Sequence, residues 1–148
     1  MNKKILALLI ILLATVSVAS VYAGEELVSH DFGKFKMDIP QSQDQITEKQ
    51  GNLNQTVYAI PNTDLTTFAF VEYVDNSSTN GNNNTTAFVL DLIKKNNTVK
   101  TEGKIISWTT ANAGETGYLV SSDDNTKVLI VTSSDTRIQQ ALNSIEFK

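Results

Sequence analysis

The segment that most constrains the fold is 115–147, which predicts two adjacent strands and then a helix. Two runs rich in β-branched and aromatic residues, 117–121 and 128–132, flank the polar stretch 122–126. This pattern is typical of a β-hairpin. The second run carries apolar or β-branched side chains at every position, and successive strand residues point to opposite faces. We therefore predict a central strand that is covered on both sides.

The residues after this hairpin predict an amphipathic helix. Ser134 or Asp135 can cap its N-terminus. Its apolar residues recur at the spacing i, i+3, i+4 and i+7, which gives a single apolar face: Ile138, Ala141, Leu142 and Ile145.

The remaining chain predicts further strands and one more helix. Strands are expected at 35–39, 46–48, 56–60 and 66–74, and one or two more over 99–108 around Gly103. The segment 27–30 is a short strand or an ordered lead-in, and a helix is expected over 87–95, capped by Thr85 or Thr86. Strands joined by short turns favour antiparallel pairing. We therefore predict the α+β class, a mostly antiparallel sheet with two main helices packed on it.

The N-terminus has the three parts of a secretory signal peptide. A basic head at 1–4 precedes the apolar run 5–18, and Val21-Tyr22-Ala23 resembles a cleavage site. We expect a signal peptide at 1–23 and a single domain at 24–148, secreted or at the cell surface, with no stable membrane insertion after cleavage. An uncleaved anchor is the alternative, because 5–22 is at the lower edge of a bilayer-spanning length.

Charge and cysteine content exclude several functions. The formal net charge is −4, and removal of Lys3 and Lys4 with the signal peptide would make it −6. An acidic domain is poorly suited to nucleic acid, whose phosphates are bound largely by Lys and Arg. The chain has no cysteine, which excludes disulfides, thiolate chemistry and Cys-based metal sites. We expect no cofactor.

Asparagine-rich segments predict a loop and modification sites. The stretch 75–85 is almost wholly polar, so we expect a mobile loop there. Five asparagines fit the N-glycosylation acceptor pattern N-x-S/T: Asn54, Asn76, Asn83, Asn84 and Asn96.

No constellation for catalysis or metal binding stands out. His30 is the sole histidine, and Asp31 beside it would point to the opposite face of a strand, so a Ser-His-Asp triad is not expected. Asp123-Asp124-Asn125 could contribute to a calcium site, but an Asp/Asn hairpin turn explains these residues without metal. A glycosidase needs two facing carboxyl groups, and the sequence does not select a pair from Glu25, Glu26, Asp38, Glu48, Glu72, Glu102 and Glu115.

Aromatic residues are the remaining candidates for ligand binding. Trp108 lies between the polar residues Ser107 and Thr109, which favours it over the tyrosines for contact with a sugar or peptide. Tyr118 and Tyr73 are the further candidates. Aromatic residues on strands also commonly belong to the core.

Both ends of the predicted domain resemble small secreted PsbP-like domains. Gly33-Lys34-Phe35-Lys36-Met37-Asp38-Ile39-Pro40 is similar to their first strand, and Ile138 to Phe147 resembles their last helix and Ser-Ile-x-Phe tail. The Trp that commonly follows the first-strand Pro is replaced by Gln41-Ser42-Gln43. The resemblance implies an α/β/α-like sandwich around an antiparallel sheet and a non-enzymatic binding or assembly role, and it transfers no functional residue.

These observations predict a non-enzymatic accessory module that binds another protein or an envelope polymer. The alternative is an envelope-associated hydrolase or carbohydrate-binding protein that uses scattered carboxylates and aromatics. A structural surface protein without a specific ligand is a third hypothesis.

Overall fold

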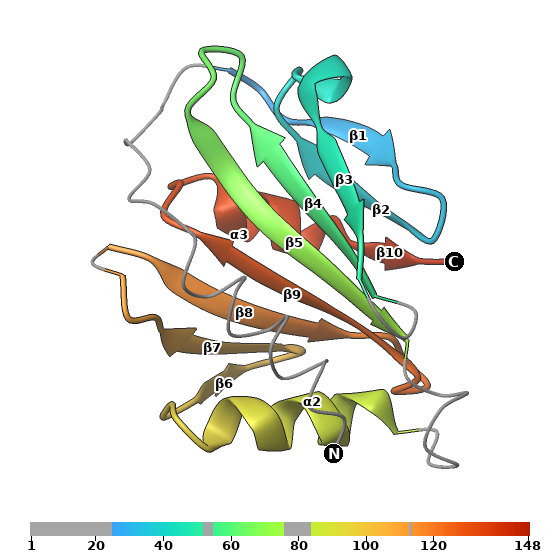
Figure 1. Ribbon diagram of the computed structural model, residues 1–148, viewed down its shortest axis with the longest axis vertical. Coiled ribbons are helices and arrows are strands. Elements are labelled where there is room, and N and C mark those ends of the chain that lie inside the picture. Colours follow the sequence, from blue (N-terminus) through green and yellow to red (C-terminus); the bar gives the residue numbers. More distant parts are fainter. Residues whose placement is uncertain (1–24, 52–54, 76–83, 113) are drawn as a thin grey trace.

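The computed structural model describes residues 25–51, 55–75, 84–112 and 114–148, and this part of the chain has an α+β fold (Figure 1). Its main sheet has seven antiparallel strands in the order β3-β4-β5-β9-β8-β7-β6. Their bounds are β3 Thr47–Gln50, β4 Gln55–Pro61, β5 Thr67–Asp75, β6 Lys100–Glu102, β7 Ile105–Thr109, β8 Thr116–Ser121 and β9 Lys127–Ser133.

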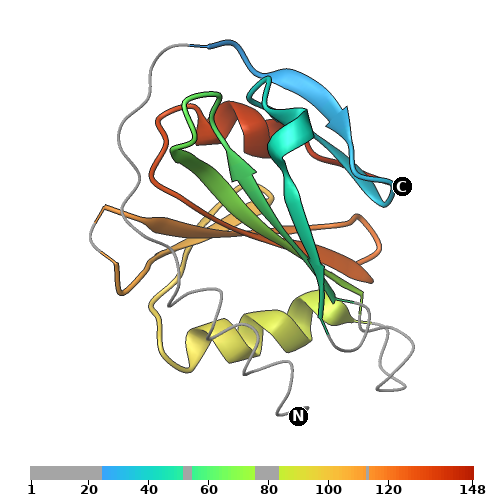
Figure 2. The same ribbon diagram turned by 45° about the horizontal axis from the view of Figure 1, so that its top comes forward.

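A second, smaller sheet and two helices cover this sheet. The small sheet has the order β1-β2-β10, with β1 Val28–Asp31, β2 Phe35–Ile39 and β10 Glu146–Phe147. Together with helix α3 (Ile138–Asn143) it lies on one face of the main sheet, and helix α2 (Thr85–Lys94) lies on the other (Figure 2). A 3₁₀ turn, η1 (Gln43–Gln45), connects β2 to β3. The described helices are too short and too polar to cross a bilayer.

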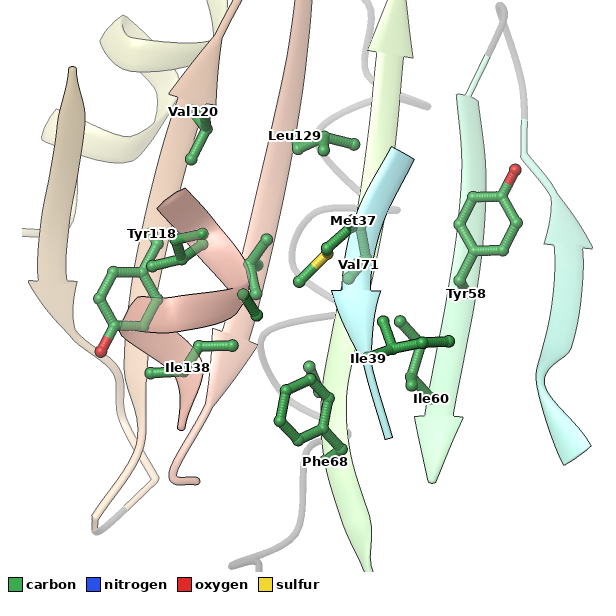
Figure 3. Close-up of a cluster of buried hydrophobic side chains, with 14 of the residues drawn as sticks. Met37, Ile39, Tyr58, Ile60, Phe68, Val71, Tyr118, Val120, Leu129 and Ile138 are labelled. Carbon is green, nitrogen blue, oxygen red and sulfur yellow. The ribbon is translucent and has the colours of Figure 1, made fainter. Parts of the chain in front are cut away.

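The larger hydrophobic core lies between the main sheet and the small sheet with α3. Figure 3 shows Met37 and Ile39 of β2 next to Val71 of β5 and Ile60 of β4. These four side chains are at most 1% exposed. Phe35 stacks on Tyr73 with ring centroids 6.1 Å apart. Because each fully buried side chain of this size stabilises the fold by about 1.5–3 kcal/mol, this layer provides most of the apolar stabilisation.

The smaller core lies between the main sheet and α2. Val89, Leu92 and Ile93 of α2 are buried in this cluster, and β9 contributes Val128 and Ile130. Strand β9 therefore packs on both faces, as its sequence predicts.

Helix α3 begins at Ile138 after a turn that Asp135 caps and that an ion-pair network holds. Arg137 is at the N-cap position without a side-chain cap, while Asp135 accepts the backbone N–H of Arg137 with its carboxylate and that of Ile138 with its backbone oxygen. Asp135 is fully enclosed, and its carboxylate accepts from the backbone N–H and the guanidinium of Arg137. Arg137 also donates to Asn62 Oδ1 at 2.6 Å and to the backbone oxygen of Glu25 at 2.8 Å. This network connects α3, the β4–β5 turn and the start of the described chain.

The prediction of the other helix was correct in type but wrong at its start. Asn84 caps α2, because its side chain accepts from the backbone N–H of Ala87 at 2.9 Å, whereas Thr85 begins the helix. The expected loop 75–85 is therefore shorter at both ends, since Asp75 ends β5. The central part of that prediction, 76–83, lies outside the described residues.

Gly117 lets an aromatic side chain lie flat on the main sheet. It is opposite Trp108 in the β7–β8 register. A Cβ atom at position 117 would lie 2.2 Å from Cε2 and 2.6 Å from Nε1 of Trp108. Trp108 is 3% exposed, so its indole has little room to move away.

We predict that Gly117→Ala destabilises the protein by about 1–3 kcal/mol, because the added methyl group overpacks this site. Urea unfolding measures the effect. In a Trp108→Leu background the cost of Gly117→Ala should become smaller, which a double-mutant cycle detects. An equal cost in both backgrounds would contradict the proposed contact.

Candidate functional site

A groove of about 770 Å³ opens where the small sheet and α3 leave the main sheet uncovered. One side is formed by the β8–β9 hairpin and the start of β7, and the other by the end of α3 and β10. We call it the C-terminal groove. Its lining residues are Lys104, Ile105, Val120, Ser121, Ser122, Asp123, Asp124, Lys127, Leu142, Asn143, Ile145, Glu146, Phe147 and Lys148.

The floor of the C-terminal groove is apolar and continuous with the larger core. Val120 and Leu142 belong to that core, and Ile105, Ile145 and Phe147 are half-buried against it. These side chains come from β7, β8, α3, β10 and the link between α3 and β10, because the hairpin and α3 end on the same side of the sheet.

The rim of the groove carries charges of both signs. Lys104 Nζ lies 2.8 Å from Asp123 Oδ1, and both side chains are exposed. Lys127 reaches across the groove and donates to the backbone oxygen of Lys148 at 2.7 Å. Hydrogen bonds from the side chains of Ser122 and Thr126 lower the pKa of Asp124 to about 2. This carboxylate is therefore ionised at any ordinary pH.

These acidic turn residues serve the hairpin itself. Asp124 accepts three hydrogen bonds within the turn, and Asp123 is paired with Lys104. Asn125 has a positive φ of 60°, which asparagine tolerates better than most residues. No group of three or more His, Asp or Glu residues in the described chain is placed to hold a metal ion.

The sheet separates the three aromatic residues predicted to bind ligand. Trp108 lies in the smaller core with α2, whereas Tyr73 and Tyr118 lie in the larger core on the other face. All three are less than 10% exposed. They cannot form one binding platform in this arrangement, and their individual contact with a ligand stays a prediction.

The remaining predicted positions are spread over the molecule. His30 is half-buried and packs edge-on against Phe32, with ring centroids 4.6 Å apart. Asp31 accepts from the backbone of Gly33 and pairs with Lys148 instead of orienting His30. Among the possible glycosylation sites, Asn84 and Asn96 are exposed, while Asn54, Asn76 and Asn83 lie outside the described residues.

A second feature, which sequence reasoning did not single out, lies on the α2 face of the main sheet. Four buried side chains of this face, Gln55, Glu72, Trp108 and Thr132, carry polar atoms that have no hydrogen-bond partner in the described structure. We call them the buried polar row. Leaving a buried polar group unpaired costs about 1–3 kcal/mol. The one feature of the sequence that indicates the buried polar row is Glu72, a carboxylate in the middle of the apolar run Phe70 to Val74.

Glu72 is the most perturbed group of this row. It is 0% exposed, and neither carboxylate oxygen has a partner among the described residues. Burial raises the pKa of Glu72 from 4.5 to about 8, because the charged form loses its hydration. Glu72 is therefore mostly protonated at neutral pH.

Glu115 is the other buried carboxyl group with a raised pKa, again because of burial. Glu72 of β5 pairs with Ile130 of β9, and Ile130 pairs with Leu119 of β8, so Leu119 and Glu72 lie at the same height in the sheet. Glu115 is four positions before Leu119. Strand spacing and rise then separate the two residues by roughly 16 Å. A glycosidase requires carboxyl groups about 5–10 Å apart, so we do not assign these two residues as a catalytic pair.

Comparisons with protein-family models, with curated proteins and with solved structures found no match to this chain. The site is therefore interpreted from its own residues.

We predict that the stability of the protein falls as the pH rises from about 4.5 to 8. The folded state keeps the proton on Glu72 while the unfolded state loses it, so unfolding becomes easier by up to about 1.4 kcal/mol per pH unit in this interval. Urea unfolding of the parent and Glu72→Gln at several pH values measures the slope. Glu72→Gln should remove most of it, and the exposed-site control Glu26→Gln should not. Parallel curves for the parent and Glu72→Gln would refute a buried, unpaired carboxyl.

Proposed function

We propose that the protein is a secreted or cell-surface binding module without catalytic activity, which holds a segment of another protein or of an envelope polymer in the C-terminal groove. The observation that carries this proposal is the combination of an apolar floor and a charged rim in a groove of about 770 Å³.

The size and composition of the groove support binding. Ligand sites commonly measure about 300–1,000 Å³ and combine an apolar lining with a few polar groups that fix orientation. Here Ile105, Val120 and Phe147 provide the apolar contact, and Lys104 and Glu146 lie on the rim. An occupant with an apolar side chain between polar or charged neighbours fits this arrangement.

The shape of the groove favours an extended occupant. It is bordered by the hairpin on one side and by α3 and β10 on the other, so a chain can enter and leave without folding back. Strand β10 pairs with β2 on one side. An extended peptide on the other side could also use the main chain of β10, as in binding by strand addition.

The export that the N-terminal sequence predicts supports a partner outside the cytoplasm. The basic head, apolar run and small-residue triplet at 1–23 indicate a signal peptide, and the absence of cysteine suits a partner bound without covalent linkage. The net charge of −6 after cleavage would favour partners with basic residues near the anchoring apolar group.

A peptide-binding experiment tests this proposal. Heptapeptides selected from a random displayed library on the purified protein are titrated against two variants of α3. Asn143→Trp fills the groove, whereas Gln140→Trp adds the same side chain at an exposed position outside the groove lining. We expect Asn143→Trp to weaken binding at least about tenfold, equivalent to about 1.4 kcal/mol, and Gln140→Trp to leave it unchanged.

Amide chemical shifts show where the peptide binds. Changes at Ser121–Asp124 and Asn143–Phe147 are expected. Equal affinity for both variants, changes confined to α2, or no binder among peptides and soluble envelope polymers would overturn the proposal.

A further inference from the structure

The strand register gives the arrangement of the buried polar row on the α2 face of the sheet. Glu72 of β5 is opposite Val57 of β4 and Ile130 of β9. Gln55 is opposite Val74, and Thr132 is opposite Phe70. Gln55 and Thr132 are therefore diagonal neighbours of Glu72 on its two sides, toward opposite ends of β5 and roughly 16 Å from each other. Diagonal neighbours lie about 7–8 Å apart, within reach of long side chains or of one small ligand between them.

The indole N–H of Trp108 belongs to the same arrangement. Trp108 is opposite Gly117, and Gly117 is opposite Thr132. Because Cε2, Cζ2 and Nε1 are the atoms closest to Gly117, this edge of the ring lies over β8, next to the strand that carries Thr132. The row therefore extends from β4 to β8.

Oxygens outnumber nitrogens among the unpartnered atoms of the buried polar row, and they act mainly as acceptors once Glu72 is ionised. Its unpartnered oxygens are both carboxylate oxygens of Glu72, the amide oxygen of Gln55 and the hydroxyl oxygen of Thr132. The unpartnered nitrogens are those of the Gln55 amide and the Trp108 indole. Acceptors gathered around a buried carboxyl group suit a ligand that brings several N–H donors and a positive charge.

Apolar and aromatic side chains border the row on the same face. Val57, Ala59 and Phe70 are only half-buried there, so the described residues do not fill this part of the layer completely. A cavity of about 120 Å³ adjoins Ala59, Thr67 and Phe70. It can take a short apolar stem, and the ring of Phe70 is placed to contact a cation near Glu72.

The other charged residues near this face do not neutralise Glu72. Lys49 of β3 pairs with Val57, which in turn pairs with Glu72, so Lys49 is two strands away from Glu72. Its side chain is exposed. Helix α2 carries Asp91 and Lys94, both exposed, and Lys95 follows it. Among the described residues no ion pair reaches Glu72. The acidic chain as a whole attracts small cations.

We propose that the buried polar row binds the ammonium group of a small organic amine. Glu72 serves as its counter-ion, the hydroxyl of Thr132 accepts a second N–H group, and the apolar stem lies toward Phe70 and Ala59, which are level with Thr132. Binding converts the Glu72 carboxyl to the carboxylate, and the released proton goes to solvent, so charge and atoms balance. This site is separate from the C-terminal groove on the other face.

A matched pair of probes tests this site. n-Butylammonium carries the proposed charge and n-butanol has nearly the same shape without it. NMR titration of the purified protein gives affinities, and a pH-stat gives the protons released. We expect n-butylammonium to bind in the range of roughly 0.1–1 mM, as suits so few non-hydrogen atoms, and n-butanol not to bind.

The pH dependence identifies the counter-ion. Because burial raises the pKa of Glu72 to about 8, about one proton should be released per amine bound at pH 6.5. The affinity should rise about tenfold per pH unit below pH 8 and level off above it. Neither effect is expected for binding at an already ionised surface carboxylate.

Two isosteric variants complete the test. Glu72→Gln should abolish binding of n-butylammonium, whereas Glu115→Gln, which alters a buried carboxyl far from the row, should leave it unchanged. Circular dichroism confirms that both variants are folded. Equal binding of n-butanol, binding without proton release, unchanged binding by Glu72→Gln, or no binding of the amine at about 10 mM, well above the expected range, would each overturn the proposal.

Discussion

The burial of β9 on both faces is the constraint on which the rest of the structure depends. Val128 to Ser133 are all buried, and alternate residues face opposite sides of the sheet. A strand of this kind is stable only when each face is covered. The small sheet with α3 covers one face, and α2 covers the other. Both helices follow from this requirement, because each presents one apolar side to the sheet.

The two faces meet this requirement differently. On the α3 face the core is almost entirely apolar, and the Arg137–Asp135 network secures its edge. On the α2 face helix α2 is the element that covers the sheet within the described residues, and the buried polar row lies in this layer. The stable apolar face can offset the cost of unpaired groups on the other, which is how proteins commonly support functional sites. We therefore expect specific ligand chemistry on the α2 face and contact with an extended partner at the C-terminal groove.

Much of the fold followed from periodicity, because periodicity reports which faces are buried. The β8–β9 hairpin, the central position of β9 and the apolar face of α2 were predicted correctly, and so was that of α3 except for Ile145, which lies after the end of this helix at Asn143. The start of α2 was predicted wrongly, since Asn84 and not Thr85 is its cap, and α3 begins only at Ile138, after the turn that Asp135 caps. The separate three-stranded sheet was not predicted, because the two-residue strand β10 carries too little local signal.

Less of the site could be predicted, because it depends on which strands become neighbours. Gln55, Glu72 and Thr132 are far apart in sequence and meet only through the order β4-β5-β9. The sequence identified Glu72 as a carboxylate but could not show that it lies among buried neighbours without a partner. Trp108, predicted as a ligand contact, does belong to this row, while Tyr73 and Tyr118 lie on the opposite face.

The measurement that tests this account most directly is the titration of Glu72 followed by the ¹³C chemical shift of its side-chain carboxyl carbon. We predict an inflection near pH 8, since burial raises the pKa of this group. Glu72→Gln identifies the resonance by its loss. An inflection near 4.5, the ordinary value for glutamate, would show that Glu72 is hydrated or paired, and it would contradict the buried polar row as described.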